Sequence, residues 1–309
     1  MKRKLLIFTL SLFFVTFGLQ GQTYRTVKGW SAEVNERLES FLNSTIPMTI
    51  RKVAVFDCDG TVFGQVPYYL ADEALYQYAD EVLKKRKDDV SVAKLKILDR
   101  MVKNGDNVGK EYVEDRVHFL SGLTAEEIEM IGYNCYRKSY AGKFYPEMKE
   151  LIANLKEYGF EVWIITASPE LLYQKFVAEE LGLHNYNVIG VKSVIKEGRV
   201  TDEIILPIPQ DDGKAHAIET FIKTRPLLVG GNSRGDMDMI NESVGLKMIV
   251  NPDDVTVRGA EDGPMKGHTV KSYWAQQGAL IVKCNDVADT NVKFHTGDWK
   301  IKKNLSNPK

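Results

Sequence analysis

Cysteine is scarce in this 309-residue sequence, which contains only Cys58, Cys135 and Cys284. Three widely spaced cysteines do not make a disulfide framework, although a bridge between Cys135 and Cys284 stays open at this point. No Cys-x-x-Cys motif or histidine pair accompanies them, which argues against a metal-thiolate site. Internal repeats and low-complexity tracts are also absent. A small disulfide-stabilised scaffold is therefore excluded.

An excess of either charge is also lacking, since the formal net charge is −1. This balance gives no indication of nucleic acid as a partner. With 44% hydrophobic and 27% charged residues, the composition is ordinary for a soluble globular enzyme.

Acidic residues are missing from the first 32 positions, where Lys2, Arg3 and Lys4 precede an apolar run over 5–19. This pattern is typical of a secretory signal peptide and is short for a membrane span. We expect cleavage after Gly21, which makes residues 1–21 the signal peptide. An uncleaved anchor is the alternative. The prediction is a secreted or periplasmic protein without a stable membrane span after cleavage.

The most informative stretch is Lys52-Val-Ala-Val-Phe-Asp57-Cys-Asp59-Gly-Thr61. A short apolar run that ends in two carboxylates predicts a buried strand that delivers acidic groups to the edge of a sheet. Asp57 and Asp59 point the same way because side chains alternate along a strand. Burying both without a cation would be costly, and oxygen ligands favour Mg²⁺. The alternative interpretation is a polar turn after a strand.

Residues 65–142 contain helical patterns and no strand pattern, which predicts a helical cap domain. A first helix is expected to begin at Pro67 and reach about Lys87, and a second to be capped by Ser91. A third is expected over 108–120. Thr124 and Glu127 form a capping box for a fourth, which extends to about 139.

Helices and strands alternate after residue 142. Strands are predicted at 160–166, 187–191, 226–230 and 246–250, with a hairpin over 193–206 and helices beginning at 146, 168, 214 and 235. This order predicts a doubly wound α/β core with a parallel sheet, built from residues 22–64 and 143–252. Asp57, Thr166 and the loop 231–236 all follow strands, so they should meet at one edge of the sheet. Residues 253–309 form a C-terminal extension without a functional interpretation, although it is expected to pack on the core.

Four motifs in this order resemble the haloacid dehalogenase superfamily of phosphatases over roughly residues 52–252. They are Asp57-Cys-Asp59-Gly-Thr61, Thr166 after an apolar strand, Lys214 at a helix start, and Gly231-Asn232-Ser-Arg-Gly-Asp236. The first motif is specific and the fourth moderately so. Thr166 as a helix cap and Lys214 as a surface lysine are the alternative interpretations.

The resemblance implies a role for each matching residue. Asp57 would be the nucleophile that forms an aspartyl-phosphate, and Asp59 the general acid and base. Mg²⁺ would be held by Asp57, the Asp59 carbonyl, Asp236 and Asn232. Thr166 and Lys214 would hold the phosphate oxygens, together with the backbone amides of Ala167 and Ser168 at the start of a helix. Many relatives have aspartate where this chain has Asn232, so its amide oxygen would contribute no charge.

The cap resembles that of phosphoserine phosphatases, and this likeness implies that Arg116 binds a substrate carboxylate. A surface helix charge is the alternative for Arg116. The glutamate that would meet a substrate amine falls on Val66, which argues against phosphoserine. Tyr68, Tyr69 and Tyr76 near Glu73 could cage an ammonium, as phosphorylcholine or phosphoethanolamine would require, but ordinary helix packing is favoured for them.

The sequence therefore predicts a secreted Mg²⁺-dependent phosphatase of small phosphomonoesters, related to phosphoserine or phosphorylcholine phosphatases. A phosphotransferase that uses the same aspartyl-phosphate is the alternative within enzymes. A phosphate-ester binding protein that has lost catalysis is the alternative outside them. Dehalogenase chemistry has no need of Asp59 and is disfavoured.

Overall fold

The computed structural model describes residues 22–254, 265 and 267–304. The predicted signal peptide, residues 1–21, lies outside the described residues. Seven strands of the described residues form one sheet, in the order β4-β3-β2-β1-β5-β6-β7. Their bounds are β1 Val53–Asp57, β2 Glu161–Pro169, β3 Val188–Lys196, β4 Arg199–Ile205, β5 Leu228–Gly231, β6 Leu246–Val250 and β7 Leu280–Val282.

Strand β1 lies at the centre of the sheet, between β2 and β5. It runs parallel to both, and β3, β6 and β7 continue the parallel order outward on the two sides. Only β4 runs antiparallel, as the second strand of the predicted hairpin. Glu197 and Gly198 form its turn with φ of 52° and 75°, the left-handed values that two-residue hairpins need. The predicted doubly wound α/β core is confirmed.

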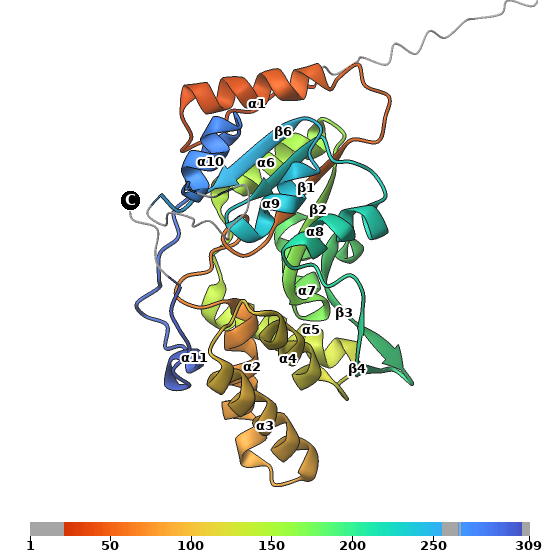
Figure 1. Ribbon diagram of the computed structural model, residues 1–309, viewed down its shortest axis with the longest axis vertical. Coiled ribbons are helices and arrows are strands. Elements are labelled where there is room, and N and C mark those ends of the chain that lie inside the picture. The colour runs from red at the N-terminus through yellow and green to blue at the C-terminus, as the bar shows by residue number, and fades with distance from the viewer. Residues whose placement is uncertain (1–21, 255–264, 266, 305–309) are drawn as a thin grey trace, which may run out of the picture.

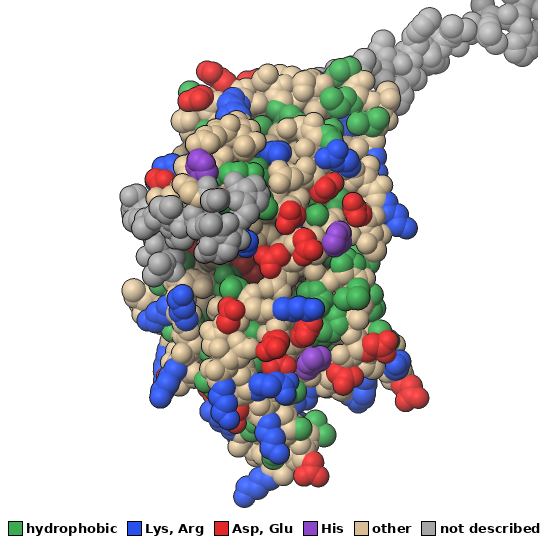
Figure 2. Space-filling view, viewed as in Figure 1, with side chains coloured by type: hydrophobic (Ala, Val, Ile, Leu, Met, Phe, Trp, Pro, Cys, Tyr) green, Lys and Arg blue, Asp and Glu red, His purple; other side chains and the backbone are tan. Residues whose placement is uncertain are grey.

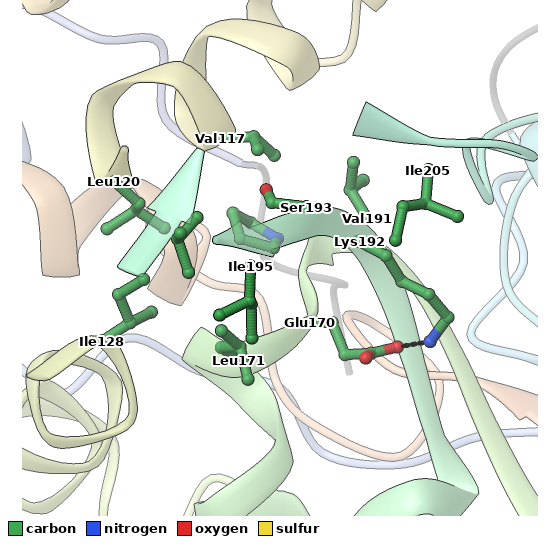
Figure 3. A pocket seen from close by; sticks show the side chains of 12 residues that line it. Val117, Leu120, Ile128, Glu170, Leu171, Val191, Lys192, Ser193, Ile195 and Ile205 are labelled. Carbon is green, nitrogen blue, oxygen red and sulfur yellow. Dashed lines mark hydrogen bonds and ion pairs between the residues drawn. The ribbon is translucent and has the colours of Figure 1, made fainter. Parts of the chain in front are cut away.

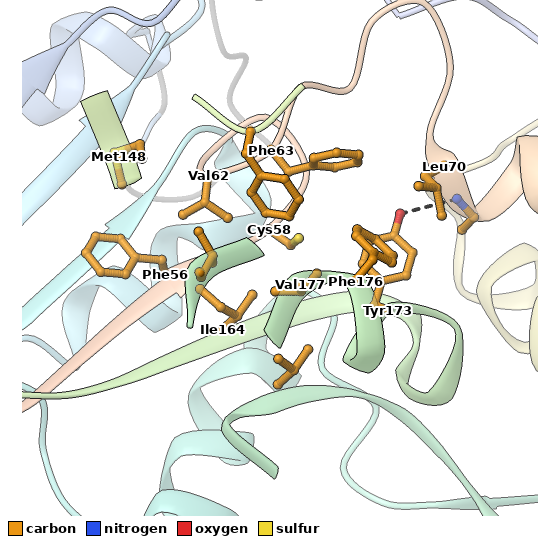
Figure 4. Packing of buried hydrophobic residues seen from close by; sticks show 14 of the residues in the cluster. Phe56, Cys58, Val62, Phe63, Leu70, Met148, Ile164, Tyr173, Phe176 and Val177 are labelled. Carbon is orange, nitrogen blue, oxygen red and sulfur yellow. Dashed lines mark hydrogen bonds between the residues drawn. The ribbon is translucent and has the colours of Figure 1, made fainter. Parts of the chain in front are cut away.

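Helices cover both faces of the sheet (Figure 1). The helices that cover the sheet are α1 Ala32–Ser44, α6 Pro146–Glu157, α7 Glu170–Leu181, α8 Asp212–Ala217, α9 Met237–Asn241 and α10 Val270–Gln276. Successive side chains of β1 point to opposite faces of the sheet and so join two different hydrophobic clusters. Ala54 and Phe56 join the cluster that contains α1, α6 and α7, and Val53 and Val55 join the one with α8, α9 and α10. Figure 4 shows Phe56 and Ile164 packed near Met148 and Val62 in the first cluster.

The chain between β1 and β2 folds into the helical cap, at the opposite end of the molecule from α1 (Figure 1). Its helices are α2 Leu70–Glu81, α3 Asp89–Asn104, α4 Lys110–Leu120 and α5 Ala125–Cys135, and a π-helical turn over Tyr136–Tyr140 continues α5. The capping box of Thr124 and Glu127 is confirmed.

Two predicted helix starts in the cap are wrong. The first helix begins at Leu70, because Pro67 to Tyr69 stay non-helical and Tyr69 is the extended N-cap residue. It also ends at Glu81, before a separate 3-10 turn at Leu83–Lys85. The second helix is capped by Asp88, whose side chain accepts the Ser91 N–H, so Ser91 lies inside the helix. Aspartate and serine are both good N-caps, and the sequence alone did not rank them.

The β3–β4 hairpin reaches the cap. Val200 exchanges backbone hydrogen bonds with the cap loop, accepting from Gly122 N at 2.7 Å and donating to Leu123 O at 2.9 Å. The Arg199 guanidinium donates to Gly122 O at 2.7 Å. The hairpin therefore holds one side of the cap in place.

The C-terminal extension holds the other side of the cap. Beyond β7, which the sequence did not predict, the chain runs along the cap to the short helix α11, His295–Asp298. There the Thr296 N–H and hydroxyl donate to the buried Glu73 carboxylate at 2.9 and 2.7 Å. Trp299 donates its indole N–H to Asp80 at 3.1 Å and packs on Tyr76. The expectation that this extension packs on the core was therefore incomplete, since it contacts the cap as well.

Asp286 joins this extension to both linkers of the cap. Its carboxylate accepts the Gln65 N–H at 2.9 Å and the Lys143 ammonium, and Lys143 also donates to Val287 O at 2.7 Å. Asp286 is only 2% exposed, so these bonds replace its hydration.

Asp286→Asn is expected to lower the free energy of unfolding by about 1–3 kcal/mol, because the change removes the carboxylate that Lys143 requires inside the fold. Urea unfolding followed by circular dichroism measures this. Asp298→Asn is the control, since Asp298 pairs with Lys293 at 3.6 Å on the surface and should have little effect. Equal effects of both substitutions would contradict the bracing role of Asp286.

All three cysteines are buried and free, so the open question of a Cys135–Cys284 bridge is answered in the negative. Cys58 lies in the main hydrophobic cluster, as expected for a small apolar residue. Among the described residues, no helix is both long and apolar enough to span a bilayer.

Candidate active site

Asp57 and Asp59 lie where β1 ends at the carboxyl edge of the sheet. Asp57 is the last residue of β1 and is 5% exposed. The Thr61 hydroxyl donates to its Oδ2 at 2.9 Å. Between Asp57 and Thr61 the chain turns at Gly60, whose φ of +85° suits glycine. The turn therefore fixes the orientation of the Asp57 carboxylate.

Lys214 joins two of the predicted site residues. It is the third residue of α8, and its ammonium donates to Asp57 Oδ1 and to Asp236 Oδ1, both at 2.6 Å. Two bonds to one nitrogen place these oxygens within about 5 Å of each other. Lys214 is buried, so the interpretation of a solvated surface lysine is wrong.

Asp236 is held by its own loop after β5. Its Oδ2 accepts from Asn232 N, Ser233 N and the Ser233 hydroxyl at 3.0, 2.9 and 3.1 Å. The Asn232 side chain lies directly against Gly60, where an added Cβ would come within 2.2 Å of Asn232 Nδ2. The loop that carries Asn232 and Asp236 is thus packed on the loop that carries Asp59.

Asp59 is surrounded by hydroxyl groups. The Tyr173 hydroxyl of α7 donates to Asp59 Oδ1 at 2.9 Å and accepts the Ala71 N–H of α2 at 3.2 Å. The hydroxyls of Thr166 and Ser168 each lie 3.4 Å from Asp59 Oδ2. Tyr173 and Ser168 were not identified from the sequence as partners of Asp59, because a hydroxyl at the start of a helix is common and carries no motif of its own.

The end of β2 differs from the prediction. The strand continues through Ala167 and Ser168 to Pro169, and α7 begins at Glu170, so Ala167 and Ser168 do not open the helix. A proline disfavours helical geometry in the residue before it, which keeps Ser168 in the strand. The Ser168 N–H is bonded to the Thr166 hydroxyl at 3.1 Å. Any anion contact here would come from the strand end.

Burial and charge separate the proton affinities of the three carboxyl groups. Burial raises the pKa of Asp57 to about 7, against the opposing effect of the Lys214 ammonium. Burial raises the pKa of Asp59 to about 6, although the Tyr173 hydrogen bond and the Arg116 charge oppose it. At Asp236 burial is outweighed by Lys214 and the loop N–H groups, which keep its pKa below the usual range. A pKa near neutrality suits a group that must donate and accept a proton.

The oxygen donors at this edge fit a hard divalent cation. Asp57 and Asp236 share the single ammonium of Lys214, and the Asp59 carboxyl lies close enough to act on Asp57, so carboxyl groups outnumber the lysine at this edge. Acidic side chains also gather over α8 and α9 on the face shown in Figure 2. An anionic ester therefore needs added positive charge to bind, and Mg²⁺ takes such oxygen ligands. Within the described residues, no three His, Cys, Asp or Glu side chains form a metal cluster by themselves, but the expected set also uses a backbone carbonyl and the Asn232 amide.

Arg116 lies inside the cap. It is 4% exposed, so the interpretation as a surface helix charge is wrong. Its guanidinium bonds to Oδ1 of the fully buried Asp72 at 2.9 Å and donates to Asn107 O at 2.9 Å. Asp72 was not identified as a site residue from the sequence, because the two residues are 44 positions apart.

Tyr68 and Tyr69, which precede α2, and Tyr76 within it are engaged in packing and do not surround an empty cage. Tyr68 lies against Phe294, and Tyr76 contacts Trp299 and shares a hydrogen bond with Tyr112. The Arg116 guanidinium lies over the rings of Tyr112 and Tyr69, at 4.9 and 5.9 Å from their centroids. A cation of the protein itself therefore already occupies these ring faces.

A largely apolar pocket of about 150 Å³ lies between the cap and the hairpin (Figure 3). Val117, Leu120 and Ile128 come from the cap. The other lining residues come from β3, β4, the end of β2 and the start of α7. Its two charged residues, Glu170 and Lys192, form an ion pair with each other. Pro169 lines the pocket and directly follows Ser168, so the pocket adjoins the Asp59 region along the chain.

The family model of haloacid dehalogenase-like hydrolases matches residues 54–241, and the chain belongs to this family. A phosphoserine phosphatase of Archaeoglobus fulgidus is 30% identical over 219 residues, 69% of this chain and 56% of the relative. The phosphoserine phosphatase SerB1 of Mycobacterium tuberculosis is 27% identical over 140 residues, 44% of each chain. The chain thus spans about half the length of these curated relatives.

Solved structures support the fold. A protein of unknown function from Anaerococcus prevotii has a TM-score of 0.60 and 17% identity, covering 82% of this chain and 92% of its own. Another protein of unknown function, from Bordetella pertussis, has a TM-score of 0.56 and 15% identity, covering 76% of this chain and 99% of its own. At these identities the likeness concerns the fold alone.

Proposed function

We propose that the protein is a phosphomonoesterase that hydrolyses a small phosphorylated metabolite through an aspartyl-phosphate on Asp57. The observation that carries the proposal is the bridging of Asp57 and Asp236 by Lys214, beside Asp59, at the carboxyl edge of the sheet. Membership of a hydrolase family and relatives named phosphoserine phosphatases support it.

In the first step a carboxylate oxygen of Asp57 attacks phosphorus, and the bond from phosphorus to the leaving oxygen breaks. Asp59 donates a proton to that oxygen, so that an alcohol leaves. Lys214 and the Thr166 hydroxyl lie where they can stabilise the negative charge on the transferring phosphoryl group. Thr61 and Lys214 hold the Asp57 carboxylate in one orientation before the attack.

In the second step Asp59 takes a proton from water, and the water oxygen attacks the phosphorus of the aspartyl-phosphate. The bond to Asp57 breaks and inorganic phosphate leaves, which restores both aspartates. The cap, held by the hairpin and the C-terminal extension, would keep other water from the intermediate.

Mg²⁺ is the cofactor that these donors favour. Asp57, Asp236, the Asp59 carbonyl and the Asn232 amide oxygen would hold it, and it would offset the repulsion between the carboxylates and the phosphate. Asn232 is a neutral ligand, so the set would carry less charge than one with aspartate there.

Hydrolysis across a panel of phosphomonoesters tests the proposal. We expect phosphate release with Mg²⁺, loss of release by at least about 100-fold in EDTA, and recovery when Mg²⁺ is restored. Added glycerol separates hydrolysis from phosphotransfer, because a phosphotransferase would form glycerol phosphate. Binding of phosphate esters without any turnover would favour the non-catalytic alternative.

We also propose that the protein is exported to the periplasm or beyond. The basic start and the apolar run over 5–19 support export, and three free, buried cysteines are compatible with an oxidising compartment. Cell fractionation with amino-terminal sequencing tests it. Export with a new terminus at Gln22 is expected, and retention of Met1 in the cytoplasm would contradict it.

A further inference from the structure

The Asp72–Arg116 pair of the cap is linked to the proposed acid through Tyr173. The Tyr173 hydroxyl donates to Asp59 and accepts the N–H of Ala71, the residue before Asp72. The first turn of α2, which carries Asp72, is therefore connected to Asp59 by one side chain, and the Arg116 charge acts on the Asp59 carboxyl. We expect a leaving group that takes its proton from Asp59 to feel the charge of this pair.

The pair is neutral as a whole and well sealed. Asp72 is 0% exposed, and its Oδ1 lies 2.9 Å from both Nε and Nη2 of Arg116. The Asn107 carbonyl accepts from Arg116, and the Asn107 amide lies 3.4 Å from the other Asp72 oxygen. A substrate carboxylate that sought Arg116 would have to compete with a carboxylate already in place.

The neighbouring charges are also compensated. The Glu73 carboxylate is occupied by Thr296 and by the His295 N–H at 2.9 Å. Glu170 and Lys192 neutralise each other in the apolar pocket. The faces of Tyr69 and Tyr112 are covered by Arg116, which leaves them unavailable to an ammonium. None of these groups offers an uncompensated charge to the leaving group.

Resting on the proposed function, we propose that the enzyme selects phosphomonoesters whose leaving group carries no charge, and that Asp72 imposes this selection by neutralising Arg116. A polyol or a similar hydroxyl-bearing alcohol fits this description. Glycerate, with its carboxylate, and ethanolamine, with its ammonium, do not. The neutral pair offers a charged leaving group no opposite charge to bind. If either member loses its partner, the remaining charge attracts a leaving group of opposite charge and repels one of like charge, and both effects are stronger in this buried position than in water.

The test compares kcat/KM for glycerol 3-phosphate, 3-phosphoglycerate and phosphoethanolamine. The wild type is expected to prefer glycerol 3-phosphate to both charged esters by about tenfold or more. Asp72→Asn leaves the Arg116 charge unmatched and should raise the ratio for 3-phosphoglycerate relative to glycerol 3-phosphate by about tenfold. Arg116→Gln leaves Asp72 unmatched and should shift the ratios the other way, toward phosphoethanolamine.

The double variant Asp72→Asn with Arg116→Gln separates charge from packing, because it removes both charges together while it carries the packing change of each single variant. Its ratios should return to within about threefold of the wild type. Asp115→Asn is the matched control on α4, since Asp115 pairs with Arg100 at 2.7 Å in the same part of the cap, and its ratios should not change.

A wild-type preference for 3-phosphoglycerate or phosphoethanolamine over glycerol 3-phosphate would overturn the inference, as would unchanged ratios in either single variant. If Asp72→Asn does not fold, Arg116→Gln is still expected to shift the ratios and the double variant to restore them. Absence of turnover even with an aryl phosphate and Mg²⁺ would instead refute the proposed phosphatase activity, so the two failures are distinguishable.

Discussion

Asp57→Asn is expected to lower kcat by about 10³-fold or more, whichever phosphomonoester is used. The amide that replaces the carboxylate is a poor nucleophile, and neither of the other two carboxyl groups of the site is free to take its place. Asp236 is bonded to three groups of its own loop, and Asp59 is bonded to Tyr173. Steady-state release of inorganic phosphate measures the loss.

The variant should keep its fold, because the amide oxygen of asparagine can still accept from Lys214 or Thr61, and Lys214 keeps Asp236 as a partner. Unchanged far-ultraviolet circular dichroism checks this. Asp238→Asn is the control, since Asp238 lies in the first turn of α9 and forms no hydrogen bond or ion pair with the site residues described above. Near-normal turnover in Asp57→Asn would refute the covalent mechanism.

Much of the core follows from local sequence patterns. The run Leu246–Val250 forms β6 at the predicted bounds, and α6 begins at Pro146, where proline suits the first helical turn. These segments were predictable because apolar residues make up most of the strand and form a single stripe along the helix. Strand β7 was not, because Leu280–Val282 is only three residues long and is a strand through its pairing with β6.

The candidate site residues could be brought together from the sequence for a topological reason. Asp57 ends β1, Thr166 lies near the end of β2 and Asp236 follows β5, and the carboxyl ends of neighbouring parallel strands meet at one edge. The cap side of the site was not predictable in the same way. Asp72 and Arg116 meet only when α2 packs on α4, and Tyr173 reaches Asp59 only when α7 is in place.

The C-terminal extension illustrates the same limit. Nothing in Asp286 or Thr296 distinguishes them from surface residues in the sequence, yet both are buried against the cap and its linkers. Their partners, Gln65 and Glu73, are more than 200 residues away in the chain. Long-range pairing of polar groups leaves no local pattern, so only the folded structure shows it.

Asp59→Asn is expected to lower kcat by about 10²–10⁴-fold for an alkyl phosphate, and to change which step limits turnover for an aryl phosphate. An alcohol leaves slowly without a proton, whereas a nitrophenolate leaves readily because its conjugate acid is much stronger. The first step should therefore survive with the aryl ester. The second step should not, because water then attacks the aspartyl-phosphate without a general base.

The aryl ester should consequently give a burst of nitrophenolate that approaches one equivalent per site, followed by slow turnover, in a stopped-flow or quenched-flow measurement. Radiolabelled phosphate should stay attached to the denatured chain and be released by hydroxylamine, which cleaves acyl phosphates. Tyr173→Phe is the comparison, since it removes the hydrogen bonds of the hydroxyl to Asp59 and from Ala71 but keeps the Asp59 carboxyl, and it should lower turnover without a burst. Equal losses for both esters with no covalent phosphate would mean that Asp59 supports the structure of the site and does not transfer protons there.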